Sequence, residues 1–168
     1  QRQMCIRDRV IDGKVGYTGG MNIANYYIKG LPEIGDWRDM HVRIEGDAVN
    51  NLQDIFLTMW NKSTKQHIGG AMYYPLLNDS IETGGKTVAI VDRVPRKSPK
   101  IMRRMYVKSL DAAQHKVQIV NPYFTPTHSI KKAIRRALKR GVEVEIMIPG
   151  KSDIPFTPDA AFYTSNKL

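Results

Sequence analysis

The chain has 168 residues, a net charge of +10, a pI near 9.8 and a single cysteine, Cys5. This length is enough to bury a hydrophobic core, so a folded globular unit is expected. One cysteine excludes an intramolecular disulfide framework and a cysteine-based zinc cluster. No apolar run reaches the roughly 18 residues of a membrane-spanning helix. The basic charge favours an anionic partner such as nucleic acid, acidic lipid or a phosphorylated substrate, or it reflects only a solvated basic surface.

The first part of the chain predicts short strands followed by one long helix. Strands are expected at 10–11 and 15–18, joined by a turn, with a helical start near Asn22. Alternating apolar and polar side chains over 40–45 predict a half-buried strand. Asp47 is the expected cap of a helix with an apolar stripe at helical spacing. That stripe consists of Val49, Leu52, Ile55, Phe56, Met59 and Trp60.

The second part of the chain alternates strand and helix after an exposed connector rich in Ser, Thr, Asn and Gly at 62–85. This order predicts a parallel sheet with helices on its faces. The expected elements are a strand at 87–91, a helix at 99–114, a strand at 116–120, a helix at 127–140 ending at Gly141, and a strand at 142–148.

Residues 10–22 combine Asp12 with the glycine pair Gly19 and Gly20 and with Asn22. Glycine lets the backbone approach another group closely, and an asparagine beside it is suited to hold phosphate oxygens. The same spacing also fits a plain hairpin with a glycine turn. Spacing alone therefore leaves both interpretations open.

Further segments extend the motif. They are Met21-Asn22-Ile23-Ala24, the run from Asp36-Trp37-Arg38-Asp39 to Gly46, Asn121-Pro122-Tyr123-Phe124-Thr125-Pro126, Arg140-Gly141-Val142-Glu143-Val144 and Pro149-Gly150-Lys151-Ser152-Asp153. Together these resemble the phospholipase D superfamily, most closely the bacterial cardiolipin synthases. The resemblance covers nearly everything from Val10 onward. It implies an α/β fold with a mixed or parallel sheet flanked by helices, in an incomplete two-repeat architecture.

The resemblance also implies roles for individual residues. Asn22 would be a phosphate ligand, Asp12 would hold the backbone and basic residue of the motif, and Gly19 and Gly20 would allow close packing at the substrate. Asp39 would orient and charge the catalytic histidine. The alternative for Asp39 is a strand-edge carboxylate paired with Arg38 or Arg43. No metal or other cofactor is implied.

In this family a His-x-Lys-x4-Asp motif precedes the glycine pair. With Asp12 as the aspartate of this motif, Cys5 and Arg7 stand at the positions of its histidine and lysine. Arginine keeps the positive charge, whereas cysteine is a poor substitute for the nucleophilic histidine. We therefore expect residues 1–9 to be a non-native leader. None of His41, His67, His115 and His128 starts a second copy of the motif, so the chain alone is expected to be inactive.

The expected organisation is the end of a first phospholipase D-like half at 10–66, a connector at 67–85 and the start of a second half at 86–168. His41 is expected to be a surface or hydrogen-bonded histidine rather than a nucleophile. The other three histidines show no partner pattern.

For the full-length protein the resemblance implies a phosphatidyltransferase that converts two phosphatidylglycerol molecules to cardiolipin and glycerol through a phosphohistidine, at the bacterial inner membrane. Its partners would be anionic phospholipid and the membrane surface. The helix at 127–140 carries a basic face that is either solvated or attracted to anionic lipid. That face consists of Lys131, Lys132, Arg135, Arg136, Lys139 and Arg140.

Two other functions stay open. A nuclease of the same superfamily would explain the basic charge through phosphate-backbone binding, although no aromatic interleaving or nucleic-acid motif accompanies it. A non-catalytic module that binds anionic lipid is the second. The sequence indicates no oligomeric state.

Overall fold

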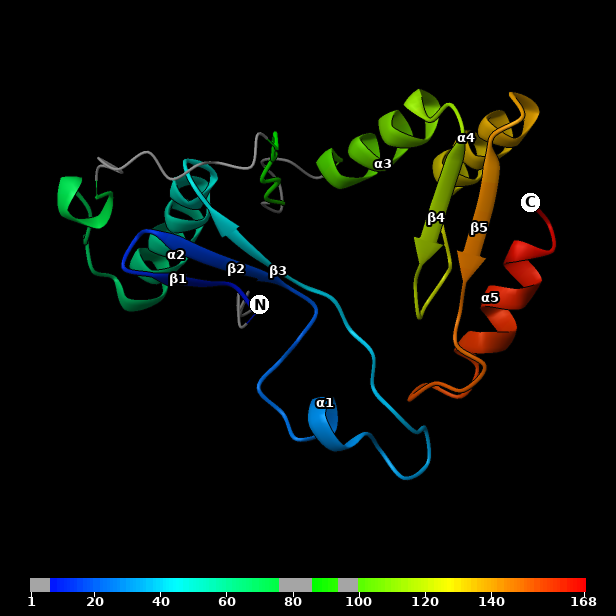
Figure 1. Ribbon diagram of the computed structural model, residues 1–168, viewed down its shortest axis with the longest axis horizontal. Helices are drawn as coiled ribbons and strands as arrows, with labels where there is room; N and C mark the ends of the chain where they lie inside the picture. The colour runs from blue at the N-terminus through cyan, green and yellow to red at the C-terminus, as the bar shows by residue number, and fades with distance from the viewer. Residues whose placement is uncertain (1–6, 76–85, 94–99) are drawn as a thin grey trace. The chain divides into compact units, whose positions relative to one another are not determined.

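The computed structural model describes residues 7–75, 86–93 and 100–168 (Figure 1). The chain divides into two units, residues 1–92 and 93–168, and each is described by itself. Cys5 and part of the expected 1–9 leader lie outside the described residues. The fold of the described residues is mixed α/β, as the sequence predicts.

The first unit is built on an antiparallel sheet of β1 (Arg9–Ile11), β2 (Val15–Gly19) and β3 (His41–Glu45) in the order β1-β2-β3. β1 and β2 form the expected hairpin, in which Arg9 pairs with Tyr17. Asp12 and Gly13 occupy the turn with positive φ angles of 53° and 65°. Antiparallel pairing follows from the short connection, because a two- to three-residue turn cannot carry the chain back for a parallel pair.

The long helix α2 (Ala48–Thr64) begins directly after Asp47, at the expected cap position, but the Asp47 side chain makes no capping hydrogen bond. Val49 and Leu52 of the expected stripe are buried, and they form a small core with Ile44 of β3. Phe56 and Trp60 are instead exposed and stack on each other with ring centroids 5.8 Å apart. The rest of this unit therefore covers only part of the apolar stripe of α2, and Phe56 and Trp60 lie outside the covered part.

Several sequence predictions for this unit are wrong in detail. The helical start near Asn22 is delayed to the one-turn helix α1 (Tyr26–Lys29). In β3 only Ile44 is buried, because Met40 and Val42 face solvent rather than a covering element. The expected connector at 62–85 starts inside α2 and contains a 3₁₀ turn, η1 (Ala71–Tyr73). The buried Gln53 of α2 donates to the Tyr73 carbonyl oxygen over 3.1 Å and holds this turn.

The strand expected at 87–91 is absent, since residues 86–93 form no ladder with any described strand. Ile90 packs against the small core of Ile44, Val49 and Leu52. A strand exists only where a neighbouring strand supplies hydrogen-bond partners. The apolar pattern of this segment therefore reflects side-chain packing alone.

The second unit contains α3 (Ile101–Ala112), β4 (Lys116–Val120), α4 (His128–Lys139), β5 (Glu143–Met147) and α5 (Thr157–Ser165). β4 and β5 pair in parallel, with Lys116 opposite Glu143 and Val120 opposite Met147. The predicted strand-helix-strand order and parallel pairing are confirmed here, whereas the first unit is antiparallel. Gly141 ends α4 with a φ angle of +83°, a left-handed conformation that favours glycine.

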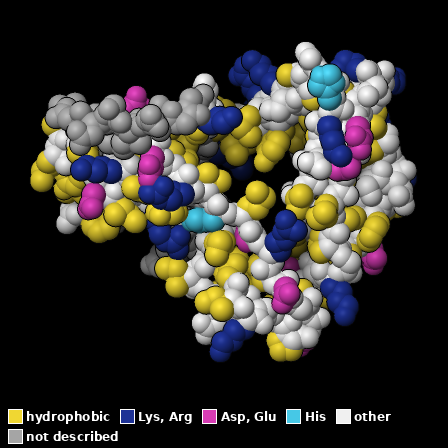
Figure 2. Space-filling model, in the orientation of Figure 1, with side chains coloured by type: hydrophobic (Ala, Val, Ile, Leu, Met, Phe, Trp, Pro, Cys, Tyr) yellow, Lys and Arg dark blue, Asp and Glu magenta, His cyan; other side chains and the backbone are white. Residues whose placement is uncertain are grey.

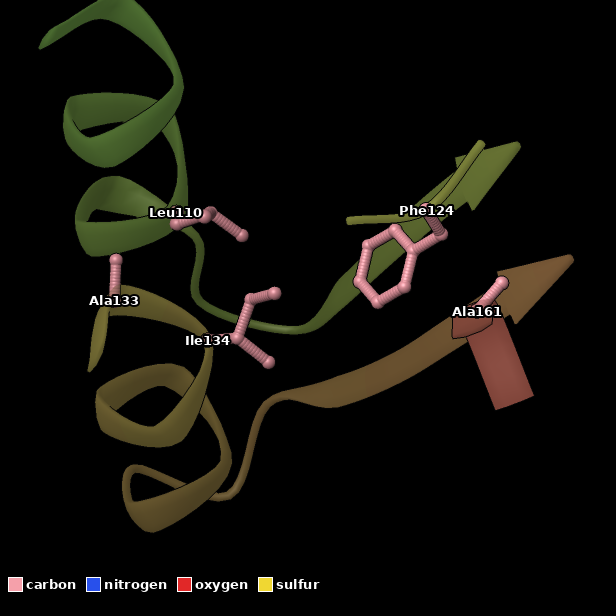
Figure 3. Packing of buried hydrophobic residues seen from close by; sticks show 5 residues of the cluster. All are labelled: Leu110, Phe124, Ala133, Ile134 and Ala161. Atoms are coloured by element: carbon pink, nitrogen blue, oxygen red, sulfur yellow. The ribbon is translucent and has the colours of Figure 1, made fainter. Parts of the chain in front are cut away.

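The core of the second unit lies where α4, β4 and the neighbouring helices meet (Figure 3). Ile134 and Ala133 of α4 are fully buried, and Phe124 and Leu110 pack in the same cluster. Ala161 of α5 completes the cluster, and its small side chain lets this helix approach closely. The inward residues of the two strands alternate with an exposed outer row that is polar except for Val120 and Met147 at the strand ends.

Candidate functional site

The glycine pair of the predicted motif lies where β2 ends beside the start of β3. The Gly20 amide donates to the Met40 carbonyl oxygen over 2.9 Å, and Gly19 pairs with His41 across the sheet. A Cβ on Gly19 would lie 2.7 Å from the His41 Nδ1 atom, and a Cβ on Gly20 would overlap the Asp39 carboxylate. Close approach of β3 therefore requires glycine at Gly19, whereas at Gly20 only the exposed Asp39 side chain would have to move.

Two buried polar atoms beside this turn have no hydrogen-bond partner among the described residues, the Asn22 Oδ1 and the His41 Nδ1. A buried polar atom without a partner costs free energy, about 1–3 kcal/mol for each one. Such atoms in a native structure call for an explanation, and one is a ligand that supplies the missing partner. The turn thus brings Asn22 and His41 to a site with unused hydrogen-bonding capacity.

The Gly20 carbonyl oxygen is the acceptor at the centre of this site. It accepts a hydrogen bond from the Arg7 Nε over 2.8 Å and one from the Tyr27 hydroxyl over 3.1 Å. Burial raises the pKa of Tyr27 above its ordinary value of 10.0, so the hydroxyl stays protonated and donates. Arg7 stands at the position of the family lysine, and the structure places its guanidinium beside the glycine turn.

Asp39 is exposed, and its Oδ1 accepts a hydrogen bond from the Met40 amide over 2.7 Å. Arg43 forms its ion pair with Glu45. The carboxylate of Asp39 faces the Gly20 backbone, so it lies at the turn together with Gly19, Gly20 and Asn22. The structure brings four of the five predicted site residues to one end of the first sheet.

Asp12 lies at the other end of β2, in the exposed β1–β2 turn. Val15 to Gly19 spans four residue steps, or roughly 13 Å at the strand rise of about 3.3 Å per residue. The Asp12 carboxylate is therefore remote from Asn22 and Asp39. Its predicted role in holding the backbone of the motif remains a prediction.

Sequence reasoning missed Arg9 and gave His41 only a structural role. The Arg9 Nη1 lies 3.3 Å from the His41 Nε2, and the His41 ring stacks with Tyr17 at a centroid distance of 6.3 Å. Thr18 donates to Asp8 over 2.6 Å, which fixes the start of β1 against β2. The alternation over 40–45 sets His41 apart from the apolar residues, but only the sheet register places it opposite Gly19.

A cavity of about 240 Å³ lies in the same unit. Its lining comprises Asp8, Thr18, Leu52, Ile55 and residues 89–92. Within the described residues, no group of three or more His, Cys, Asp or Glu side chains is arranged to hold a metal ion. A search of the same residues also finds no helix long and apolar enough to span a membrane.

The basic face of α4 is largely committed to contacts within the second unit. Arg136 forms a bidentate ion pair with Asp111, with hydrogen bonds of 2.9 and 2.8 Å. Arg140 donates to the carbonyl oxygens of Leu110 and Ala113 at the end of α3, and Arg135 donates to the Lys167 carbonyl oxygen. Three of the six predicted basic residues therefore fasten α4 to its neighbours.

A second cluster of polar side chains lies beyond the carboxyl ends of β4 and β5. The Tyr123 hydroxyl donates to the Asp153 Oδ1 over 2.6 Å, and Ser152 donates to the same oxygen over 3.0 Å. The hydrogen bond from Tyr123 lowers the pKa of Asp153 below its usual 3.8. These contacts join the two segments that follow the parallel strands.

The comparisons with known proteins agree with this architecture. The family model described as "Cardiolipin synthase, PLD-like domain" matches residues 106–168. "Cardiolipin synthase" of Staphylococcus aureus strain Mu50 is 39% identical over 149 residues, 88% of this chain and 30% of the relative. "Cardiolipin synthase 2" of Staphylococcus epidermidis strain RP62A is 37% identical over 150 residues, with the same two coverages. No solved structure gives a significant match.

"Cardiolipin synthase 1" of Staphylococcus aureus strain COL is 38% identical over 161 residues, 95% of this chain and 32% of the relative. The matches to these relatives and to the family model define a phospholipase D-like protein. The chain belongs to that superfamily, in the branch of the bacterial cardiolipin synthases. It spans about a third of the length of the curated relatives that it matches, which the 30–32% coverage states directly.

Proposed function

We propose that this chain forms part of a phosphatidyltransferase that joins two phosphatidylglycerol molecules into cardiolipin with release of glycerol. The observation that carries the proposal is the buried, unpartnered Asn22 Oδ1 beside the Gly19–Gly20 turn, in a chain of this family. A phosphodiester seated at the turn would use both atoms of the Asn22 amide. The Nδ2 would donate to a nonbridging oxygen, and the Oδ1 would accept a hydrogen bond from a substrate hydroxyl.

The proposed reaction has two steps. A histidine nitrogen attacks the phosphorus of one phosphatidylglycerol, and the bond to its glycerol oxygen breaks with protonation of that leaving alcohol. The hydroxyl of a second phosphatidylglycerol then loses its proton to a general base and attacks the phosphohistidine, which frees the histidine. The chemistry is a net exchange of alcohols on phosphorus, so it needs neither a reductant nor an oxidant.

The residues of the site divide this work. Asn22 would position one of the nonbridging oxygens, and the basic residue of the native motif, at the position that Arg7 occupies beside Gly20, would neutralise the charge that develops on them. Asp39 would orient the attacking histidine. None of the four histidines of the 168 residues stands in a His-x-Lys-x4-Asp pattern. The first motif histidine falls at the position of Cys5, so the proposal assigns it to the native sequence in place of the expected leader, and assigns the second histidine to sequence outside these residues. The chain alone is therefore expected to be inactive.

The proposal places the full-length protein at the bacterial inner membrane, with phosphatidylglycerol as donor and acceptor. Support comes from the names of the relatives, which are cardiolipin synthases. The nuclease alternative has the net charge of +10 in its favour. Part of that charge is committed to packing, since Arg135, Arg136 and Arg140 contact groups in their own unit.

The test uses membranes that contain the full reading frame and labelled phosphatidylglycerol, with products separated by thin-layer chromatography. We expect cardiolipin and glycerol, and a loss of roughly 10²–10³-fold in rate for Asn22→Ala, the usual effect of removing one preorganised donor. Asn25→Ala is the matched control, because Asn25 is exposed and makes no side-chain cap bond.

Equal rates for Asn22→Ala and the unaltered protein would contradict the role of the turn. Absence of cardiolipin, together with cleavage of labelled single-stranded DNA, would favour the nuclease. Binding to anionic vesicles with no turnover of either substrate would favour the binding module.

A further inference from the structure

The segment between β2 and β3, residues 21–40, leaves the sheet at the glycine turn and returns to it at the same point (Figure 1). The hydrogen bond from the Gly20 amide to the Met40 carbonyl oxygen closes its base. We refer to residues 21–40 as the excursion. It carries α1, and the amide of Leu31 donates to the Gly35 carbonyl oxygen in a small closed turn.

Several large apolar side chains of the excursion are exposed. Of the large hydrophobic side chains in the described part of the chain, the four most exposed are Ile23 at 88%, Ile28 at 85%, Met72 at 83% and Met40 at 72%. Three of these four belong to the excursion. Figure 2 shows hydrophobic side chains together with basic ones at the surface over α1 and its flanking segments. Apolar side chains concentrated on one exposed segment indicate a surface for interaction.

Three aromatic rings of the excursion pack against one another. Tyr26 lies 4.8 Å from Trp37 and 4.6 Å from Tyr27, measured between ring centroids. The Tyr27 hydroxyl donates to the Gly20 carbonyl oxygen, which anchors this aromatic cluster to the site. Tyrosine and tryptophan favour the boundary between headgroups and acyl chains, because each has an apolar ring and a polar atom. Lys29 and Arg38 are exposed on the same excursion.

We propose that the excursion is the element that enters the lipid headgroup layer, with Ile23 and Ile28 reaching the acyl boundary, and so brings the glycine turn to its phospholipid. This inference rests on the proposed function. A phospholipid keeps its chains in the hydrocarbon while its phosphodiester stays in the headgroup layer. The site must therefore come within reach of that layer. Ile23 follows Asn22 directly, so their Cα atoms are only about 3.8 Å apart.

The exposed isoleucines and the aromatic cluster favour a lipid surface as the occupant. Charge does not contribute at this segment, because Lys29 and Arg38 are offset by Glu33, Asp36 and Asp39. An interfacial element typically buries its apolar face about 5–10 Å into the boundary region. The basic face of α4 is a weaker candidate for this contact. Its Arg135, Arg136 and Arg140 are already bound to groups of the second unit.

The two tryptophans of the chain, Trp37 and Trp60, make the inference directly measurable. Trp37 lies in the excursion, and Trp60 lies in α2 with its Nε1 donating to Gln66. In Trp60→Phe only Trp37 emits. On addition of vesicles of phosphatidylglycerol and phosphatidylcholine, we expect its emission to shift to the blue and to be quenched by brominated acyl chains. In Trp37→Phe the remaining Trp60 is the matched control and should show neither change.

A second measurement uses vesicle flotation of the chain and of Ile23→Ser/Ile28→Ser. Each isoleucine withdrawn from an apolar environment costs roughly tenfold in partition, so the double variant should bind at least about tenfold more weakly. Met72→Ser is the control, since Met72 is equally exposed but lies in η1. Far-UV circular dichroism and the Trp60 emission verify that the variants fold.

Four results would overturn the inference. The first is that aqueous iodide still quenches the Trp37 emission when vesicles are present. The second is that Met72→Ser weakens vesicle binding as much as the double variant does. Vesicle binding would persist in the double variant while its self-association is lost, which would assign the excursion to a second copy of this chain. Alternatively, binding would depend on Lys131, Lys132 and Lys139 rather than on the isoleucines.

These readouts are independent of catalysis, so the two proposals fail separately. If the full reading frame turns over detergent-dispersed phosphatidylglycerol while Trp37 stays outside the bilayer, the excursion inference is wrong and the transferase proposal stands. If Trp37 inserts and no cardiolipin forms, the transferase proposal is wrong and the excursion is a membrane-binding element of a protein with another activity.

Discussion

The first unit builds its sheet from antiparallel strands, and its buried core contains Ile44, Val49 and Leu52. The second unit builds a parallel pair around α4, and its buried core contains five residues, among them Ile134 and Phe124. The unpartnered buried polar atoms, those of Asn22 and His41, both belong to the first unit. In the described parts of this chain, dense apolar packing and unsatisfied polar groups are thus segregated into different units.

This contrast has a physical basis. A parallel pair needs a crossover helix, and that helix must bury one face on the strands, which creates a core. A hairpin needs no such cover, so its strand ends are free to hold glycines and polar side chains at the surface. The comparison predicts that substitutions in the core of the second unit cost more stability than those at the turn, which also change local geometry and binding.

The largest expected effect is that of Ile134→Ala, which empties a fully buried position in α4. Substitutions of this kind cost about 2–5 kcal/mol because the cavity left behind collapses only partly. The midpoint temperature of thermal unfolding of the second unit, followed by circular dichroism, should therefore decrease. Both tryptophans, Trp37 and Trp60, lie in the first unit, so their fluorescence transition should move much less.

Leu138→Ala is the control for this experiment, since Leu138 lies on the same helix with 42% of its side chain exposed. Equal shifts for Leu138→Ala and Ile134→Ala would show that the apolar cluster of Figure 3 is not the principal support of the second unit.

The next effect concerns the glycine turn. Gly19→Ala would introduce a Cβ at a φ angle of +155° against His41, and backbone strain of this kind costs on the order of 1–3 kcal/mol. We expect a lower unfolding midpoint in the tryptophan fluorescence signal of the first unit. Gly69→Ala should leave that midpoint unchanged, because no atom lies within 4 Å of a Cβ at Gly69. A neutral Gly19→Ala would contradict the close approach of β2 and β3.

The smallest effect is a pH dependence in the second unit. The hydrogen bond from Arg136 lowers the pKa of Asp111 below its usual 3.8. A carboxyl with a lowered folded-state pKa contributes stability that is fully present above the unfolded value and is lost as pH falls through the folded value. The midpoint temperature of unfolding should therefore decrease when the pH is lowered below about 4. Asp111 is exposed, so the change is small and sensitive to salt.

Asp111→Asn is the comparison variant for the pH experiment. It keeps the shape of the side chain and removes its titration, so its unfolding midpoint should vary less with pH in the same range. Identical pH profiles for the two proteins would show that the Arg136–Asp111 pair contributes nothing measurable.

The sequence alone determined the elements that have strong local signals. The amphipathic pattern around Ile134 specified α4, and Gly141 specified its end, because helical periodicity and left-handed glycine are properties of short segments. The hairpin of β1 and β2 followed in the same way from its turn residues. The motif residues Gly19, Gly20, Asn22 and Asp39 were also identified from sequence, by resemblance to a family.

Only the tertiary structure decided which of these features meet. The register of β2 and β3 placed His41 beside Gly19 and left Asp12 at the far end of the hairpin. Met40 and Val42 lie in solvent, and residues 87–91 pair with none of the described strands. Contacts with neighbouring elements committed Arg136 and Arg140 to packing. The physical reason is that periodicity fixes the local conformation and facing direction of a side chain, whereas its partner depends on contacts distant in sequence.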